Sequence, residues 1–208
     1  MNKYSKMYLV LFIALVVLSG TGTTFAAPLP KKSDFHDAMR KLWEDHITWT
    51  RLFIVSALAD LPDKGSTTER LLRNQVDIGN AVKAFYGDAA GEKLTSLLND
   101  HIKTAAEVVL AAKMNDKEKQ KEATDRWYTN ADEIAAFLSG ANPKNWRAAE
   151  MKAMMHEHLD LTATEVFARL KSDWAGDIAA YAKVHTQILK MADMLSGGII
   201  RQFPKNFR

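Results

Sequence analysis

The chain has 208 residues, and its 28 Lys and Arg stand against 25 Asp and Glu. It contains no cysteine, which excludes disulfides, thiolate metal sites, covalently attached c-type haem and a thiol nucleophile. A hydrophobic fraction of 47%, with only five prolines and ten glycines, is typical of a globular protein and excludes fibrous and disordered classes.

The first 26 residues have the pattern of a secretory signal peptide. Lys3 and Lys6 precede an unbroken apolar run at residues 7–18, and cleavage after Ala26 would leave small residues, Thr24 and Ala26, at the two positions that signal peptidase reads. The apolar run is short against the roughly 20 residues of a spanning helix. We therefore expect an exported, extracytoplasmic protein with no stable membrane span after cleavage; an uncleaved membrane anchor is the alternative.

Removal of the predicted signal peptide would lower the net positive charge of the chain. Residues 1–26 hold two of the basic residues and none of the acidic ones, so the mature chain is nearly neutral. No basic patch remains, and we expect no nucleic-acid partner.

The mature chain is predicted to be one all-α domain. Residues 27–32 form a short leader, residues 33–203 the domain and residues 204–208 a tail. Helical periodicity and the short connections favour an antiparallel bundle of about six helices. Caps such as Ser33, Thr67 or Thr68, Asp116, Asp173 and Gly87 set approximate bounds at 33–60, 67–86, 88–113, 116–139, 146–171 and 173–200.

Related stretches recur along the chain. Residues 42–47, 97–102 and 155–159 each combine an acidic residue, a histidine and an aliphatic residue. This pattern predicts a degenerate repeat of αα-hairpins, with chance similarity between helical sequences as the alternative.

Four histidines fall on apolar stripes of their helices, spaced alternately by three and four residues. They are His46, His101, His158 and His185, and the last stripe also runs through Trp174 and Ile178. Gln75 and Asn130 are the polar residues on the stripes of the second and fourth helices.

A buried imidazole needs a partner, and several that converge could share a metal ion or cofactor, together with a carboxylate such as Glu165. Imidazole suits Cu, Zn, Fe and Ni, and the same side chains could hold a non-covalent haem. We therefore expect a transition-metal or small-cofactor site made of these histidines and Glu165. The alternative is a non-enzymatic cell-surface or envelope module, with a protein partner or a structural role, whose histidines only complete the core.

A second candidate metal strip is formed by Met154, Met155, His156 and His158, since thioethers and imidazoles bind Cu(I). The favoured interpretation is that the methionines fill the core and that His156 is solvated. His36 is expected at the surface.

The sequence nominates no catalytic residue. It lacks Glu-x-x-His at the four histidines, His-Glu-x-x-His, and a Gly-x-Ser-x-Gly elbow. A non-enzymatic protein is therefore favoured.

Several strings resemble a family of small exported bacterial helical proteins. They are residues 42–51, residues 74–81, residues 141–143 with Trp146, residues 165–170, and Phe203-Pro204. The resemblance spans residues 42–204. It implies an exported helical domain and assigns no activity and no site residues.

Overall fold

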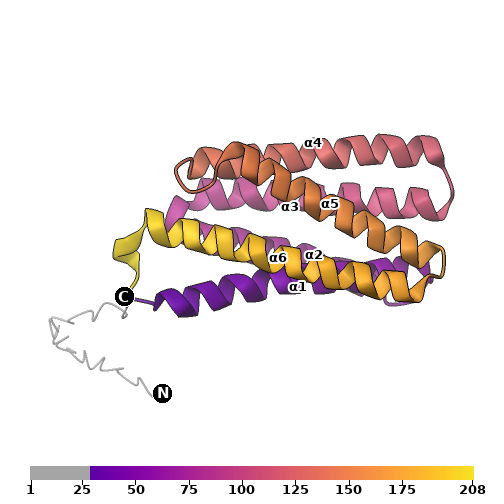
Figure 1. Cartoon of the computed structure of the whole chain (residues 1–208), viewed down its shortest axis with the longest axis horizontal. Coiled ribbons are helices and arrows are strands. Elements are labelled where there is room, and N and C mark those ends of the chain that lie inside the picture. Colours follow the sequence, from indigo (N-terminus) through magenta and orange to yellow (C-terminus); the bar gives the residue numbers. More distant parts are fainter. Residues whose placement is uncertain (1–28) are drawn as a thin grey trace, which may run out of the picture.

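The computed structural model describes residues 29–208, which are all-helical as predicted (Figure 1). The predicted signal peptide lies outside these residues. The helices are α1 (Lys32–Leu58), α2 (Lys64–Tyr86), α3 (Asp88–Lys113), α4 (Lys117–Ala141), α5 (Ala148–Leu170) and α6 (Trp174–Gln202), followed by a short 3-10 turn, η1 (Pro204–Asn206).

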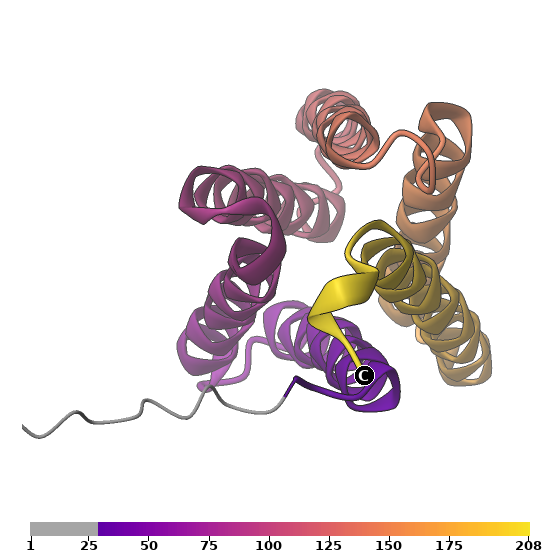
Figure 2. The ribbon, with the colours of Figure 1, turned by 90° about the vertical axis from the view of Figure 1, so that its left-hand side faces the viewer.

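The six helices form a closed ring. Each packs against the next along the chain, and α6 packs back against α1 (Figure 2). The odd-numbered helices run in one direction and the even-numbered helices in the other (Figure 1). Helix α3 also contacts α1 and α5, so the odd-numbered helices meet inside the ring. No helix among residues 29–208 is long and apolar enough to cross a membrane.

Two of the predicted helix starts are confirmed by their caps. The Asp116 carboxylate accepts a hydrogen bond from the backbone N–H of Lys119, and that of Asp173 from Gly176, which satisfies donors that an N-terminal turn leaves free.

The first two helix starts differ from the prediction. Helix α1 begins at Lys32 without a side-chain cap. Helix α2 begins at Lys64, and the Thr67 hydroxyl donates to the Lys64 carbonyl from inside the first turn. A hydroxyl can satisfy a neighbouring carbonyl within a helix as well as cap it, so residue type alone places these starts a few residues wrongly.

The three odd-numbered helices end in the same way, which confirms the predicted hairpin repeat. Each is followed by a non-glycine residue in the left-handed region: Asp60, Asn115 and Ser172, with φ of 51°, 55° and 58°. These residues lie at equal distances in sequence after His46, His101 and His158. The next N–H bonds back to the last helical turn in every case, as in a Schellman motif.

The apolar core consists of two clusters. The larger includes Met39, Trp43, Leu94, Trp127 and Met151. The smaller lies toward the C-terminal ends of the odd-numbered helices and contains Phe53, Ile54, Ala57, Leu71, Ile102, Val109 and Val166. The candidate site lies between them.

Candidate functional site

Three of the predicted histidines are buried on helices that meet inside the ring. His46 on α1, His101 on α3 and His158 on α5 are 3%, 3% and 4% exposed, and the ring centres of His46 and His158 are 5.7 Å apart. We refer to His46, His101 and His158 as the histidine layer. The repeat accounts for the layer, because each hairpin places one histidine at the same height.

Each of these histidines faces an amide side chain on the following helix. The pairs are His46 with Gln75, His101 with Asn130 and His158 with Gln187, each separated by 29 residues. The constant spacing is the sequence signal that identifies the pairs. Sequence periodicity places Gln75 and Asn130 on inward stripes but does not pair them with the histidines, and it places His185 rather than Gln187 on the inward stripe of the sixth helix.

His101 has partners at both ring nitrogens. Its Nδ1 lies 2.9 Å from Asn130 Oδ1, while Asn130 Nδ2 donates to the Leu97 carbonyl at 3.0 Å. The amide oxygen therefore faces the ring, so Nδ1 carries the proton. The indole of Trp127 donates to Nε2 at 3.2 Å. His101 is thus a neutral imidazole with both nitrogens engaged.

His158 follows the same design. Its Nδ1 lies 3.2 Å from Gln187 Oε1, and Gln187 Nε2 donates to the Met154 carbonyl at 2.9 Å. Each amide therefore connects a histidine to the backbone one turn before it.

The first hairpin departs from this pattern. Asn74, not Gln75, donates to the Leu42 carbonyl, at 3.0 Å. Gln75 Nε2 lies 3.4 Å from His46 Nδ1 and donates to the Leu71 carbonyl. Within the described residues, Gln75 Oε1 and Trp43 Nε1 are buried without a hydrogen-bond partner. His46 is consequently the least satisfied member of the layer.

Burial keeps the layer neutral. It lowers the pKa of His101 to about 3, with a further contribution from His158, against the raising effect of Asn130. Burial also lowers the pKa of His158 to about 4 and that of His46 well below the ordinary 6.5. No carboxylate contributes to these shifts, so the environment favours uncharged imidazoles.

The inward placement of His185 is wrong. Its side chain is 37% exposed, and Nε2 lies 2.8 Å from Glu44 Oε1 on α1. The buried face of α6 runs instead through Asp177, Val184, Gln187 and Ile188. Adjacent stripes of a helix differ by one residue, or about 100°, and this change moves His185 out of the core.

The expected role of Glu165 beside the histidines is also wrong. Glu165 lies two turns beyond His158, about 10 Å along the helix axis, in an ion-pair network. Arg51 contacts Glu165 Oε1 at 2.6 Å and Asp177 Oδ1 at 2.8 Å, and Arg169 contacts Asp177 Oδ2 at 2.8 Å.

Glu165 and Asp177 both contact Arg51, but their pKa values shift in opposite directions. Burial raises the pKa of Glu165 to about 7, only partly offset by Arg51. Burial also acts to raise the pKa of Asp177, but the hydrogen bonds from Arg51 and Arg169 outweigh it and lower that pKa.

The methionine-rich strip is core packing, as the favoured interpretation had it. Met155 is 3% exposed and Met154 packs against the larger cluster. His156 Nε2 lies 2.7 Å from Asp132 Oδ1 at the surface. Among residues 29–208, no group of three or more histidine, aspartate or glutamate side chains is arranged to hold a metal ion.

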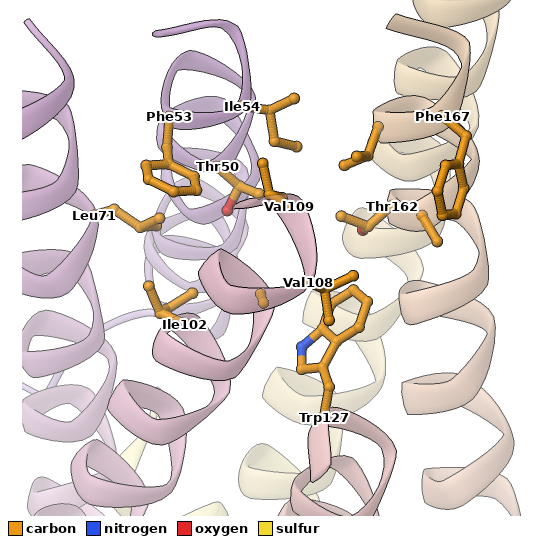
Figure 3. Close-up of a pocket in the computed structure, with 13 residues that line it drawn as sticks. Thr50, Phe53, Ile54, Leu71, Ile102, Val108, Val109, Trp127, Thr162 and Phe167 are labelled. Carbon is orange, nitrogen blue, oxygen red and sulfur yellow. The ribbon is translucent and has the colours of Figure 1, made fainter. Parts of the chain in front are cut away.

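An apolar pocket lies next to the histidine layer. Thirteen residues from α1, α2, α3, α4 and α5 line a narrow hollow with an enclosed space of about 30 Å³ (Figure 3). Thr50, Ala105 and Thr162 lie one turn beyond His46, His101 and His158, and the second turn supplies Phe53, Ile54, Val108, Val109 and Val166. The pocket is therefore the next level of the same repeat.

The polar groups around the pocket are already engaged. The hydroxyls of Thr50 and Thr162 donate to the carbonyls of His46 and His158, each at 2.8 Å, and the Trp127 N–H is taken by His101. Apart from these side chains the lining is aliphatic or aromatic. The pocket thus offers an apolar surface without a charge or a free donor.

The chain matches no family model, no curated protein and no solved structure.

Proposed function

We propose that the protein is a non-enzymatic binding protein that holds a small, uncharged, apolar molecule in the pocket beside the histidine layer. The observation that carries this proposal is the hollow between α1, α3 and α5, which is apolar although it lies beside three buried histidines. Concave apolar cavities are the usual form of small-molecule sites. In this function the histidines are core residues, and the predicted signal peptide would place the protein outside the cytoplasm.

The pocket also defines which molecules it should reject. No Lys or Arg lines it, and burying an unpaired carboxylate is strongly unfavourable. An anionic ligand would lose its hydration without gaining a partner.

Because the enclosed space is only about 30 Å³, a bound ring must push the surrounding side chains apart. Toluene and benzoate make a matched pair of probes, since they share a ring and differ in charge. Titration followed by NMR should show saturable toluene binding, with Kd on the order of 0.1–1 mM for so small a ligand, and no benzoate binding. Ala163→Phe, which fills the pocket from its wall, should abolish toluene binding, whereas Ala179→Phe on the exposed face of α6 should not. Equal binding of toluene by both variants would contradict the proposal.

A metal site is a second candidate, favoured by one distance. The 5.7 Å between the ring centres of His46 and His158 suits two imidazoles on one ion, given metal–nitrogen bonds of about 2 Å. His101 is engaged at both nitrogens, so at most two of the predicted ligands would serve.

Metal binding can be tested by elemental analysis of the protein purified from its own compartment. His46→Ala and His158→Ala should each lower the metal content if the ion is shared, and His185→Ala serves as the surface control. Unchanged metal in both core variants would rule out this candidate.

A further inference from the structure

The residues that line the pocket differ in how deeply they are buried. Nine of its lining residues are buried, and four are half-buried: Thr50, Ala105, Ala163 and Phe167. Three of these four lie on α3 and α5, and Phe167 is the only large one among them. The side of the pocket between α3 and α5 is therefore the side nearest to solvent.

The polar contacts of α5 explain why the ring is weakest there. Its first half is tied to α4, because Asp132 contacts Lys152 and His156 at 2.7 Å and Tyr128 bonds to Asp160. Beyond Asp160, no hydrogen bond or ion pair within residues 29–208 joins α5 to α4 or to α3. The polar contacts of the second half of α5 to other helices lie on the opposite side, where Glu165 contacts Arg51 on α1 and Arg169 contacts Asp177 on α6.

The shape of the ring agrees with this distribution. Helix α5 crosses obliquely from α4 toward α6, so that its second half diverges from α4 (Figure 1). In the close-up, Val108 and Trp127 lie opposite Thr162, and Phe167 lies beyond Thr162 on the same helix (Figure 3). The small residues Ala105 and Ala163 lie on α3 and α5 at this side of the pocket. The Phe167 ring is therefore the principal obstacle to entry.

We propose that small apolar molecules enter and leave the pocket between α3 and α5, and that Phe167 is the gate. This inference rests on the proposed function. A half-buried phenylalanine can change rotamer without breaking a hydrogen bond, whereas the buried walls would have to separate packed helices. Phe167 therefore controls the rate at which a ligand enters the pocket.

The association rate of toluene distinguishes a gate from an ordinary wall. Loss of wall contacts weakens binding by speeding dissociation and leaves association unchanged. Removal of a gate speeds association. We expect Phe167→Ala to raise the association rate constant of toluene at least tenfold, measured by NMR exchange spectroscopy at several toluene concentrations.

Phe53→Ala is the matched control, because Phe53 lines the buried side of the same pocket. It should change the dissociation rate and leave the association rate within twofold of the parent protein. Phe167→Leu retains more of the packing and should give an intermediate association rate, so the test holds if the alanine variant fails to fold. Equal association rates in the parent protein and both Phe167 variants would overturn the role of Phe167 as a gate but not the proposed function. Absence of toluene binding in every protein would overturn the proposed function.

Discussion

At the scale of single residues, the amide partners determine the state of the buried histidines. Asn130 shows this most clearly, since its carbonyl faces His101 while its NH2 group is bound to the Leu97 carbonyl. The amide cannot rotate without losing both bonds. It therefore holds His101 as one tautomer and fixes the direction of the bond from Trp127.

Replacement of Asn130 by alanine should destabilise the protein strongly. The variant leaves the buried His101 N–H unpaired and removes the second hydrogen bond that the helical Leu97 carbonyl accepts, and we expect a loss of about 1–3 kcal/mol in the free energy of unfolding. Urea denaturation measures it. Thr129→Ala, at the exposed neighbouring position, should stay within about 0.5 kcal/mol. A similar small loss for Asn130→Ala would show that the pair contributes little.

At the scale of elements, the sequence predicts the helices better than it predicts their faces. Apolar periodicity locates all six helices to within a few residues, and Asp116 and Asp173 mark two starts correctly. The face of α6 was predicted wrongly because Trp174 and Ile178 count as apolar and Asp177 as polar. In the fold Trp174 and Ile178 are 55% and 64% exposed, while Asp177 is buried against Arg51 and Arg169.

Local sequence patterns also predict only part of the candidate site. Three of the four predicted histidines are buried, because their repeats place them on faces that the hairpins share. The ion-pair partner of Glu165 lies 114 residues away, and no local pattern reveals it. The pocket was not predicted either, since the sequence shows which residues are apolar but not where their packing leaves a gap.

The turn after each odd-numbered helix gives a prediction at this scale. Ser172 has a φ of 58°, a conformation that costs a non-glycine residue about 1–2 kcal/mol. Glycine avoids this cost but loses more conformational entropy on folding, which offsets about 0.5–1 kcal/mol of the gain. Ser172→Gly should thus raise the free energy of unfolding by about 0.5–1 kcal/mol, seen as a higher melting temperature.

Asn115→Gly offers the comparison, since asparagine tolerates the left-handed region and its φ is nearly the same, 55°. Its gain should be the smaller of the two. No stabilisation by Ser172→Gly would mean that this turn is not strained.

At the scale of the whole molecule, the neutral histidine layer links folding to pH. The three histidines have lowered pKa values in the fold, so their contribution is complete at neutral pH and declines as the pH falls below about 6.5. Each can remove up to about 1.4 kcal/mol per pH unit. Glu165 acts in the opposite sense between pH 7 and 4.5, because its pKa is raised, but it is one group against three.

Urea midpoints measured from pH 7.5 to 4.5 should therefore fall steadily below pH 6.5. His158→Gln should flatten this decline, since glutamine does not titrate, while His185→Gln at the surface should leave it unchanged. A pH profile that is the same in all three proteins would contradict the link to the buried layer.

The closed ring has a consequence for the order of the chain. The backbone N–H of Arg208 donates to the Pro30 carbonyl at 3.1 Å, so the two ends of the described chain lie side by side, where α6 meets α1. With three repeated hairpins around the ring, the α6–α1 boundary is one of three comparable junctions, alongside those between α2 and α3 and between α4 and α5. The order of the three hairpins around the ring is therefore interchangeable, and a circular permutant of the described residues, joined at residues 30 and 208 and opened near Gly87, would keep every helix contact of the ring.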